Sequence, residues 1–233
     1  VDLKPSGDHY MEHLHEAGGL NAVLRELTPH LSLDAPTVSG ATLGENIATG
    51  EIVAGQTVVR TPDAPIQGQG GLAVLRGNLA PRGALIKHSA ATPELLTHTG
   101  RAVVFDSLAD LAQRIDDPDL DVAPDDVLVL RNAGPKGAPG MPEAGYIPIP
   151  KKLATAGVKD MVRLSDARMS GTAFGTIVLH ITPESYGGGP LGLVRTGDTI
   201  TLDTPARTLT LNVSEEELEQ RRSTWEPPPP HPG

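Results

Sequence analysis

Two loops of this sequence contain the residues best suited to chemistry, and a serine lies at the centre of the first. Residues 165–175 read Ser-Asp-Ala-Arg-Met-Ser-Gly-Thr-Ala-Phe-Gly and lie between two predicted strands. Gly171 follows Ser170, so the Ser170 hydroxyl is expected on a sharp turn open to a substrate, with the Thr172 hydroxyl nearby. The Gly-x-Ser-x-Gly pattern of hydrolases is not met, because Arg168 occupies its first glycine position. The residue types alone also fit hydroxyls that cap nearby backbone groups.

The second loop, residues 132–145, is dense in glycine and proline and contains a single carboxylate, Glu143. It reads Asn-Ala-Gly-Pro-Lys-Gly-Ala-Pro-Gly-Met-Pro-Glu-Ala-Gly and follows a predicted strand. Glycine and proline define a tight backbone path, so an ordered loop is expected. A phosphate-binding P-loop is excluded, because no Gly-Lys-Ser/Thr ending follows. The residue types alone fit an ordered surface turn.

Three other patterns are weaker candidates for a site. Residues 68–73 loosely match a dinucleotide fingerprint, but they precede a predicted strand instead of following one. His9 and His13 are four residues apart on a predicted helix, yet the His-Glu-x-x-His metal pattern is absent. The acidic run 116–121 lacks the glycine and the final glutamate of a calcium loop. We therefore expect the histidine pair to lie on an exposed helix face and the acidic run to form a solvated loop.

Composition narrows the class of protein. The 233 residues include no cysteine, which excludes disulfides, thiolate zinc sites, a cysteine nucleophile and a cysteine-held iron–sulfur cluster within this chain. A formal net charge of −10 and an aromatic content of 3% argue against nucleic acid as a partner. No apolar run reaches the ~20 residues of a membrane helix and no signal-peptide pattern is present, so we expect a cytoplasmic protein without membrane contact. Because the chain starts at Val1 and not at methionine, we expect a piece of a longer protein.

The elements that position these loops differ between the two ends of the chain. Residues 1–55 are predicted to form a helical connector, because apolar residues recur at helical spacing over 10–27, with a break at a Gly-Gly pair. A second short helix is predicted over 42–48. At the other end, the proline-rich tail 227–233 is expected to be disordered or extended.

Residues 56–226 have the texture of a β domain, with short apolar runs separated by turn residues. Helices are predicted over 107–115 and 214–225, the second with a capping box formed by Ser214 and Glu217. Many short strands with few helices predict a mixed α and β fold, a closed or nearly closed β-barrel flanked by helices. The predicted strands are 72–75, 84–87, 102–105, 127–130, 161–164, 176–179, 191–194, 199–202 and 208–213.

Taken in order, the motifs resemble the family of dihydroxy-acid and sugar-acid dehydratases over nearly the whole chain. The loops 132–145 and 165–175 are the most specific parts of the resemblance. The other matching segments are 4–7 (Lys-Pro-Ser-Gly), 17–27, 37–46, 71–81, 180–184 (His-Ile-Thr-Pro-Glu) and 188–190 (Gly-Gly-Pro). So many motifs in the same order do not arise by chance.

The resemblance implies a hydro-lyase that removes water from a 2,3-dihydroxy acid and yields a 2-keto-3-deoxy acid. Family members use a cysteine-held iron–sulfur cluster and a magnesium ion, supplied mostly by an N-terminal domain. Their C-terminal domain is a barrel-like swivelling domain that closes the site. By motif position, Ser170 matches the proton-abstracting serine and Glu143 matches a magnesium ligand. Thr172 and Arg168 are expected to contact the substrate.

These implied roles suit the chemistry. A neutral serine hydroxyl is a weak base, so a nearby cation must favour its ionised form. Magnesium is a hard cation that prefers oxygen ligands, and Glu143 offers one. The C3 hydroxyl is a poor leaving group and needs a Lewis acid, which the cluster iron would supply.

The substrate branch can also be argued from the resemblance. The segments 147–152 (Ile-Pro-Ile-Pro-Lys-Lys) and 166–172 (Asp-Ala-Arg-Met-Ser-Gly-Thr) resemble the sugar-acid branch, so an aldonate such as arabinonate or xylonate is expected. The alternative enzyme is the dihydroxy-acid dehydratase of branched-chain amino-acid synthesis, whose motif more usually reads Asp-Gly-Arg-Phe-Ser-Gly. If the chain is naturally stand-alone, a non-catalytic binding or regulatory module is the other alternative.

The resemblance also sets expectations for partners and cofactors. The full-length protein is expected to contain magnesium and an iron–sulfur cluster and to form a homo-oligomer. Its cluster-binding N-terminal domain would pack against this chain. Alone, the chain lacks the cluster cysteines, so we expect it to bind neither cofactor tightly and to be inactive.

Overall fold

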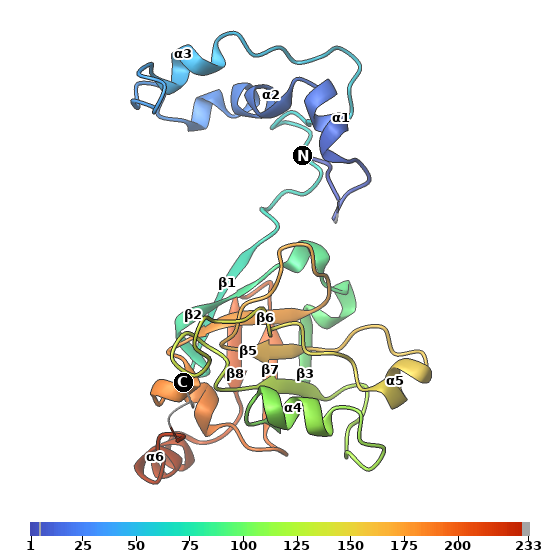
Figure 1. The fold of residues 1–233 in the computed structure, drawn as a ribbon, viewed down its shortest axis with the longest axis vertical. Coiled ribbons are helices and arrows are strands. Elements are labelled where there is room, and N and C mark those ends of the chain that lie inside the picture. Colours follow the sequence, from blue (N-terminus) through green and yellow to red (C-terminus); the bar gives the residue numbers. More distant parts are fainter. Residues whose placement is uncertain (5, 230–233) are drawn as a thin grey trace. The chain divides into compact units, whose positions relative to one another are not determined.

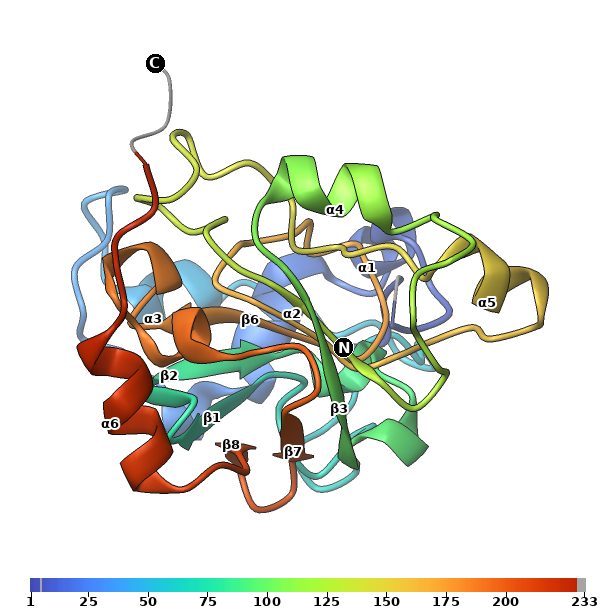
Figure 2. The ribbon, with the colours of Figure 1, turned by 90° about the horizontal axis from the view of Figure 1, so that it is seen from below.

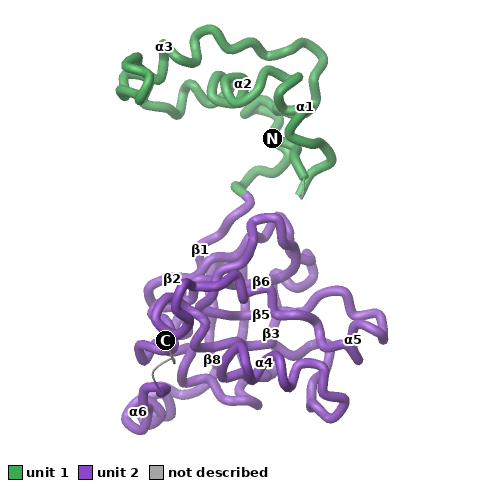
Figure 3. The backbone as a smooth tube through the Cα atoms, viewed as in Figure 1, with its two compact units in different colours: residues 1–70 green, residues 71–233 purple. Residues whose placement is uncertain are grey.

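The computed structural model describes residues 1–4 and 6–229 and divides the chain into two compact units, residues 1–70 and 71–233 (Figures 1 and 3). Each unit is described by itself. Residues 230–233, the end of the predicted tail, lie outside the described residues. Residues 227–229 are in neither a helix nor a strand.

The first unit is built from short helices around a small apolar core. Its helices are α1 (Met11–Glu16), α2 (Gly19–Glu26) and α3 (Leu43–Ile47), with a 3₁₀ turn at Thr28–His30. The predicted break between the first two is present: Gly18 has φ of 110°, and a Cβ there would lie 1.9 Å from the carbonyl oxygen of Glu51. Thr42 caps α3 in a reciprocal arrangement with Glu45. The core consists of Ala17, Ala22, Val58 and Val59.

The second unit is a closed barrel of eight strands in the order β1-β2-β6-β5-β4-β3-β7-β8 (Figures 1 and 2). Strands β3, β4, β5 and β6 run parallel to one another, and most other neighbours pair antiparallel. A parallel contact between Arg76 of β1 and Thr208 of β8 closes the barrel. The strands are β1 (Ala73–Gly77), β2 (Ala80–Ile86), β3 (Thr97–Phe105), β4 (Val127–Leu130), β5 (Arg163–Ser165), β6 (Ile177–Thr182), β7 (Thr199–Asp203) and β8 (Thr208–Leu211). The predicted barrel is therefore confirmed.

Strand β4 explains how the barrel is packed. All four of its residues are buried, as expected of a parallel strand that is covered on both faces. Val129 joins the core inside the barrel, whereas Leu128 and Leu130 join an outer core beneath α4 (Leu108–Arg114). Because side chains alternate along a strand, one apolar run contributes to both cores.

The helices α4 and α6 (Glu215–Ser223) lie on the outside of the barrel, and both begin at predicted caps (Figure 2). Ser107 caps α4, and Ser214 caps α6 by accepting from the backbone N–H of Glu217 at 3.1 Å. The second half of the predicted capping box is not formed. The Glu217 carboxylate instead accepts from Arg221 at 2.7 Å, one turn further along the helix.

One predicted strand of this unit was wrong, and one short helix was missed. Residues 191–194 are not a strand: Pro190–Leu193 forms a 3₁₀ turn, and Leu191 and Leu193 are apolar because they fill the barrel core. The short helix α5 (Lys151–Thr155) was not predicted. Its first turn follows Pro150, and none of its residues is buried, so no apolar periodicity marks it in the sequence.

Candidate active site

The topology of the barrel brings the two candidate loops to one edge. Strands β4 and β5 are parallel neighbours in which Leu130 lies beside Ser165. Residues 131–145 and 166–175 therefore leave the sheet from the same end, the carboxyl end of parallel strands. This is the edge where ligands bind in many α/β folds.

Arg168 joins the serine loop, residues 166–175, to the loop that contains Glu143. Its contacts in that loop lie on both sides of Glu143. Its Nε donates to the carbonyl oxygen of Met141 at 2.6 Å, and its Nη1 lies 3.2 Å from Oε1 of Glu143. The backbone carbonyl of Arg168 accepts from the N–H of Gly145 at 2.8 Å. A Cβ at Gly145 would lie 2.9 Å from the backbone carbonyl oxygen of Arg168, so this close approach of the two loops favours glycine. The structure thus brings Arg168 and Glu143 together, as an ion pair that is about half exposed.

Ser170 lies on a tight turn, as predicted. Its Oγ is 2.7 Å from the Thr172 hydroxyl, and it also accepts from the N–H of Thr172 at 3.3 Å. The carbonyl of Ser170 accepts from Ala173 at 3.1 Å, which closes the turn. The hydroxyl pair on this turn is held by local hydrogen bonds, and Thr172 is exposed to solvent.

Lys87 is a residue of this region that the sequence did not single out. It follows β2, and its Nζ donates to the carbonyl oxygen of Gly171 at 2.8 Å. A cation is therefore bound to the carbonyl group of the residue that follows Ser170. Positive charge near a hydroxyl favours its ionised form. A single lysine after a strand has no sequence signature, so only the fold could reveal this contact.

Glu143 fits the role of one metal ligand among several. It is a solvent-accessible carboxylate at the end of an ordered loop. Within residues 1–4 and 6–229, no group of three or more His, Asp or Glu side chains could hold a metal ion. Magnesium needs several oxygen ligands, so further ligands would have to come from outside the described residues.

Asp166 and Glu184 also reach this edge, and sequence reasoning gave neither a role. Asp166 is only 2% exposed. Its carboxylate accepts from the backbone of Ala133 at 3.0 Å and from the backbone and hydroxyl of Ser185 at 2.8 and 2.5 Å. Burial raises the pKa of the Asp166 carboxyl, although the hydrogen bonds from Ser185 and Ala133 act to lower it. With His180 and Lys136, both carboxylates line a pocket of about 400 Å³.

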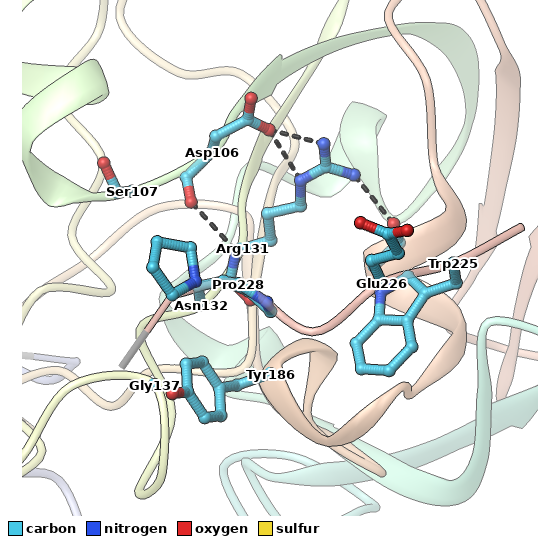
Figure 4. Close-up of a pocket in the computed structure, with 11 residues that line it drawn as sticks. Asp106, Ser107, Arg131, Asn132, Gly137, Tyr186, Trp225, Glu226 and Pro228 are labelled. Carbon is cyan, nitrogen blue, oxygen red and sulfur yellow. Dashed lines mark hydrogen bonds and ion pairs between the residues drawn. The ribbon is translucent and has the colours of Figure 1, made fainter. Parts of the chain in front are cut away.

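A second pocket, of about 520 Å³, lies beside the start of the 132–145 loop (Figure 4). Arg131 turns toward Asp106 there, and its Nη1 donates to the carbonyl oxygens of Gly192 and Val194 at 2.8 and 3.0 Å. Tyr186 and Trp225 contribute aromatic rings. None of the four predicted site residues lines this pocket, so it is distinct from the candidate active site.

The weaker candidates have structural explanations. The rings of His9 and His13 pack edge to face at 5.4 Å, and His9 lies 3.7 Å from Asp2. In the acidic run, Asp116 accepts from the backbone of Lys151 at 3.0 Å, and the Asp121 carboxylate lies 2.7 Å from Arg101. These contacts hold local structure.

The comparisons with known proteins identify the family. A model of the dihydroxy-acid/6-phosphogluconate dehydratase C-terminal domain matches residues 57–232, and a model of the N-terminal domain of the same enzymes matches residues 1–46. The chain belongs to this dehydratase family. No helix among its described residues has the length and apolar character needed to cross a membrane.

Three curated relatives show the range of this dehydratase family. An L-arabonate dehydratase of Azospirillum brasilense is 52% identical over 97% of the chain and 39% of its own length. A 6-deoxy-6-sulfo-D-gluconate dehydratase of Pseudomonas putida is 51% identical over 96% of the chain and 39% of its own length. A dihydroxy-acid dehydratase of Carboxydothermus hydrogenoformans is 46% identical over 98% of the chain and 41% of its own length. The chain thus spans about two fifths of the length of these relatives.

Proposed function

We propose that this chain is the C-terminal part of a sugar-acid dehydratase, which converts an aldonate into a 2-keto-3-deoxy acid. The observation that carries the proposal is the pairing of Arg168 with Glu143. This pairing joins the loop of the proposed metal ligand to the loop of the proposed base, Ser170, at the carboxyl ends of parallel strands.

The sequence comparisons support an aldonate over a branched-chain dihydroxy acid. The relatives named for sugar acids are 52% and 51% identical to the chain, against 46% for the dihydroxy-acid dehydratase. The difference is small, so the dihydroxy acid of branched-chain amino-acid synthesis is the alternative substrate. Both reactions are the same elimination and would use the same residues.

In the proposed reaction, Ser170 takes the proton from C2 of the acid. The electron pair of the C2–H bond forms the C2–C3 double bond, and the C3–O bond breaks with its electron pair on oxygen. The departing hydroxide takes up one proton and leaves as water, and loss of the proton that Ser170 accepted balances this uptake and restores the ionised serine. The resulting enol rearranges to the 2-keto acid. Removal of the C2 proton requires an ionised serine. The Lys87 ammonium, which donates a hydrogen bond to the carbonyl oxygen of Gly171, would favour that ionised form. Thr172 would orient the Ser170 oxygen through their 2.7 Å hydrogen bond.

Glu143 would hold magnesium together with ligands from the N-terminal part of the protein. When bound, the metal ion would polarise the carboxylate of the substrate, and an iron–sulfur cluster in that part would act as a Lewis acid on the C3 hydroxyl. The chain itself has no cysteine with which to bind a cluster. On this proposal, the barrel is a swivelling domain that closes over the N-terminal part, and the full-length enzyme is a cytoplasmic homo-oligomer.

The test is an assay of the full-length protein that contains this chain. Purified with its cluster intact and supplied with magnesium, it should convert L-arabinonate or D-xylonate into a 2-keto-3-deoxy acid. The assay should include 2,3-dihydroxyisovalerate as the competing substrate. Turnover of 2,3-dihydroxyisovalerate alone would show that the substrate is the branched-chain dihydroxy acid and not an aldonate. Turnover of none of the three acids would contradict the proposal.

A further inference from the structure

Three segments leave the same edge of the barrel, and the proposed reaction uses only two of them. Strands β4, β5 and β6 are consecutive parallel neighbours, so their carboxyl ends lie side by side. They continue into the Glu143 loop (132–145), the Ser170 loop (166–175) and a third segment, 183–189. The third begins within the His-Ile-Thr-Pro-Glu motif at 180–184, for which the proposed reaction gives no role.

Asp166 is the point at which all three segments meet. It is the first residue of the Ser170 loop, and its side chain is buried. Its Oδ1 accepts from the N–H of Ala133 in the Glu143 loop, and its Oδ2 accepts twice from Ser185 in the third segment. Ser185 in turn contacts Asn132: its hydroxyl accepts from the Asn132 N–H at 2.6 Å and lies 3.1 Å from the Asn132 side-chain oxygen.

Glu184 adds a second connection between the third segment and the Glu143 loop. Its Oε2 accepts from the backbone N–H of Lys136 at 2.9 Å and of Gly137 at 3.4 Å. Gly134 passes so close that a Cβ there would lie 2.6 Å from the same oxygen. Both carboxylates therefore accept hydrogen bonds from the backbone of the Glu143 loop, and Asp166 also accepts from Ser185.

We propose that Asp166 and Glu184 are positioning residues, which hold the Glu143 loop and the Ser170 loop at a fixed separation. Asp166 acts on both loops, whereas Glu184 acts on the Glu143 loop alone. The inference rests on the proposed function for its catalytic consequence. The coupling of the two loops can be measured without any activity.

Asp166 and Glu184 differ in the number of carboxylate oxygens that accept hydrogen bonds. Both oxygens of Asp166 accept, and the donors are two backbone N–H groups and one hydroxyl. Asparagine has one acceptor oxygen, so Asp166→Asn would place an NH₂ group against a buried N–H donor. Glu184 uses a single oxygen for both of its hydrogen bonds. Glu184→Gln therefore keeps the connection, and Glu184→Ala removes it.

The first experiment is hydrogen–deuterium exchange on this chain, followed by mass spectrometry. Asp166→Asn should raise exchange in both 132–145 and 166–175, by about tenfold for amides whose protection depends on one lost hydrogen bond. Glu184→Ala should raise exchange in 132–145 alone, and Glu184→Gln should restore it. Asp198→Asn is the matched control, because Asp198 is a partly buried carboxylate that pairs with Arg221, accepts from the backbone N–H of Arg195 and has no recorded contact with either loop among the described residues.

The second experiment measures the magnesium activation constant and the solvent exchange of the C2 hydrogen in the full-length enzyme. Asp166→Asn should raise the constant and slow C2 exchange together, each by about tenfold or more. Glu184→Ala should raise the constant and leave C2 exchange within about twofold of wild type, because it acts on one loop. The Asp198→Asn control should lower the melting temperature and change neither quantity.

The two experiments test different parts of the proposal, so each part can be contradicted without the other. If Asp166→Asn perturbs only the residues around 185, the coupling of the loops is refuted, whatever the enzyme does. If the exchange results hold but wild-type protein dehydrates no acid, the positioning role in catalysis is lost together with the proposed function, and the structural coupling stands. If Glu184→Gln fails to restore protection, the single-oxygen account of Glu184 is wrong.

Discussion

The guanidinium group of Arg168 lies 3.2 Å from the carboxylate of Glu143, and this contact joins the two loops that carry the candidate catalytic groups. The sequence-based interpretation placed Arg168 at the substrate. Its Nε donates to the carbonyl of Met141 and one Nη lies against Glu143, so we propose that the same side chain also orients the loop of the proposed metal ligand.

This contact predicts the effect of Arg168→Gln. The ion pair is about half exposed, so its loss should change the free energy of unfolding by no more than about 1 kcal/mol. In the full-length enzyme, losing the group that orients a metal ligand should raise the magnesium activation constant by about tenfold. Thermal melts and magnesium titrations of turnover measure the two effects. A raised KM for the acid with unchanged magnesium dependence would return Arg168 to a substrate contact.

The isolated chain should be folded but inactive. The barrel is closed and carries two continuous apolar cores, so purified protein should show a cooperative melt. Having no cysteine, it should show no iron absorbance. We expect no dehydration of an aldonate by this chain alone. Measurable turnover would refute the proposed division of labour between the two parts of the enzyme.

Glu143 should influence metal binding only in the intact enzyme. One carboxylate cannot compete with the hydration shell of magnesium, so calorimetry on the isolated chain should detect no tight binding. In the full-length enzyme, Glu143→Gln should weaken the magnesium dependence of turnover markedly. Glu226→Gln, at an exposed carboxylate outside the candidate site, is the matched control. An unchanged magnesium response in Glu143→Gln would exclude it as a ligand.

Acid should destabilise the barrel through Asp160 and Asp198. Burial opposes ionisation of both, but hydrogen bonds and nearby arginines outweigh it, so the pKa of each lies below its ordinary value. A lowered pKa in the folded state contributes stability that is complete above the ordinary value of 3.8 and is lost as the pH falls below it. Melting temperatures from pH 6 to pH 2 should therefore drop most steeply below about pH 4.

Asp198→Asn should flatten that acid slope. The variant removes one group with a lowered pKa, and it should also melt at a lower temperature at pH 6, because the buried guanidinium of Arg221 loses its charged partner. If the variant keeps the slope of the wild type, Asp198 does not contribute to it and the ion pair with Arg221 is not formed in solution.

Much of the barrel could be predicted from sequence, because its strands are short apolar runs bounded by turn residues. The order of the strands could not, because β2 pairs with β6 and β3 with β7 across long stretches of chain. The run at 191–194 shows the limit of the method. Leu191 and Leu193 alternate with other residues as a strand would, yet both side chains enter the core from a 3₁₀ turn.

The residues of the candidate site also fall into those that the sequence could mark and those that only the structure shows. Ser170 and Glu143 stand in motifs that the family resemblance could mark, whereas Lys87 is recognisable only once β2 lies beside β6. Asp166 and Glu184 had a signal, since both belong to matching segments of the sequence. Their partners are backbone groups of other loops, which no side-chain pattern encodes, so their role needed the structure.

Ser170 is the residue on which the proposed function depends most. Ser170→Ala removes one oxygen, together with hydrogen bonds to Thr172 that are local and partly exposed, so folding should barely change. In the full-length enzyme, turnover should fall by roughly 10² or more, the scale of losing a positioned proton-transfer group. Substrate affinity should change much less, because the rest of the site still binds the acid.

The competing explanation, a hydroxyl that only caps its own turn, predicts the reverse result for Ser170→Ala. Because Oγ of Ser170 accepts from the backbone of Thr172, a capping role would lower the melting temperature and leave turnover largely intact. Thr172→Val is the matched variant, since it removes the hydroxyl partner and leaves Ser170 in place. Melting temperature, turnover and solvent exchange of the C2 hydrogen should be measured on the same samples. Exchange at C2 that survives in Ser170→Ala would show that another group is the base.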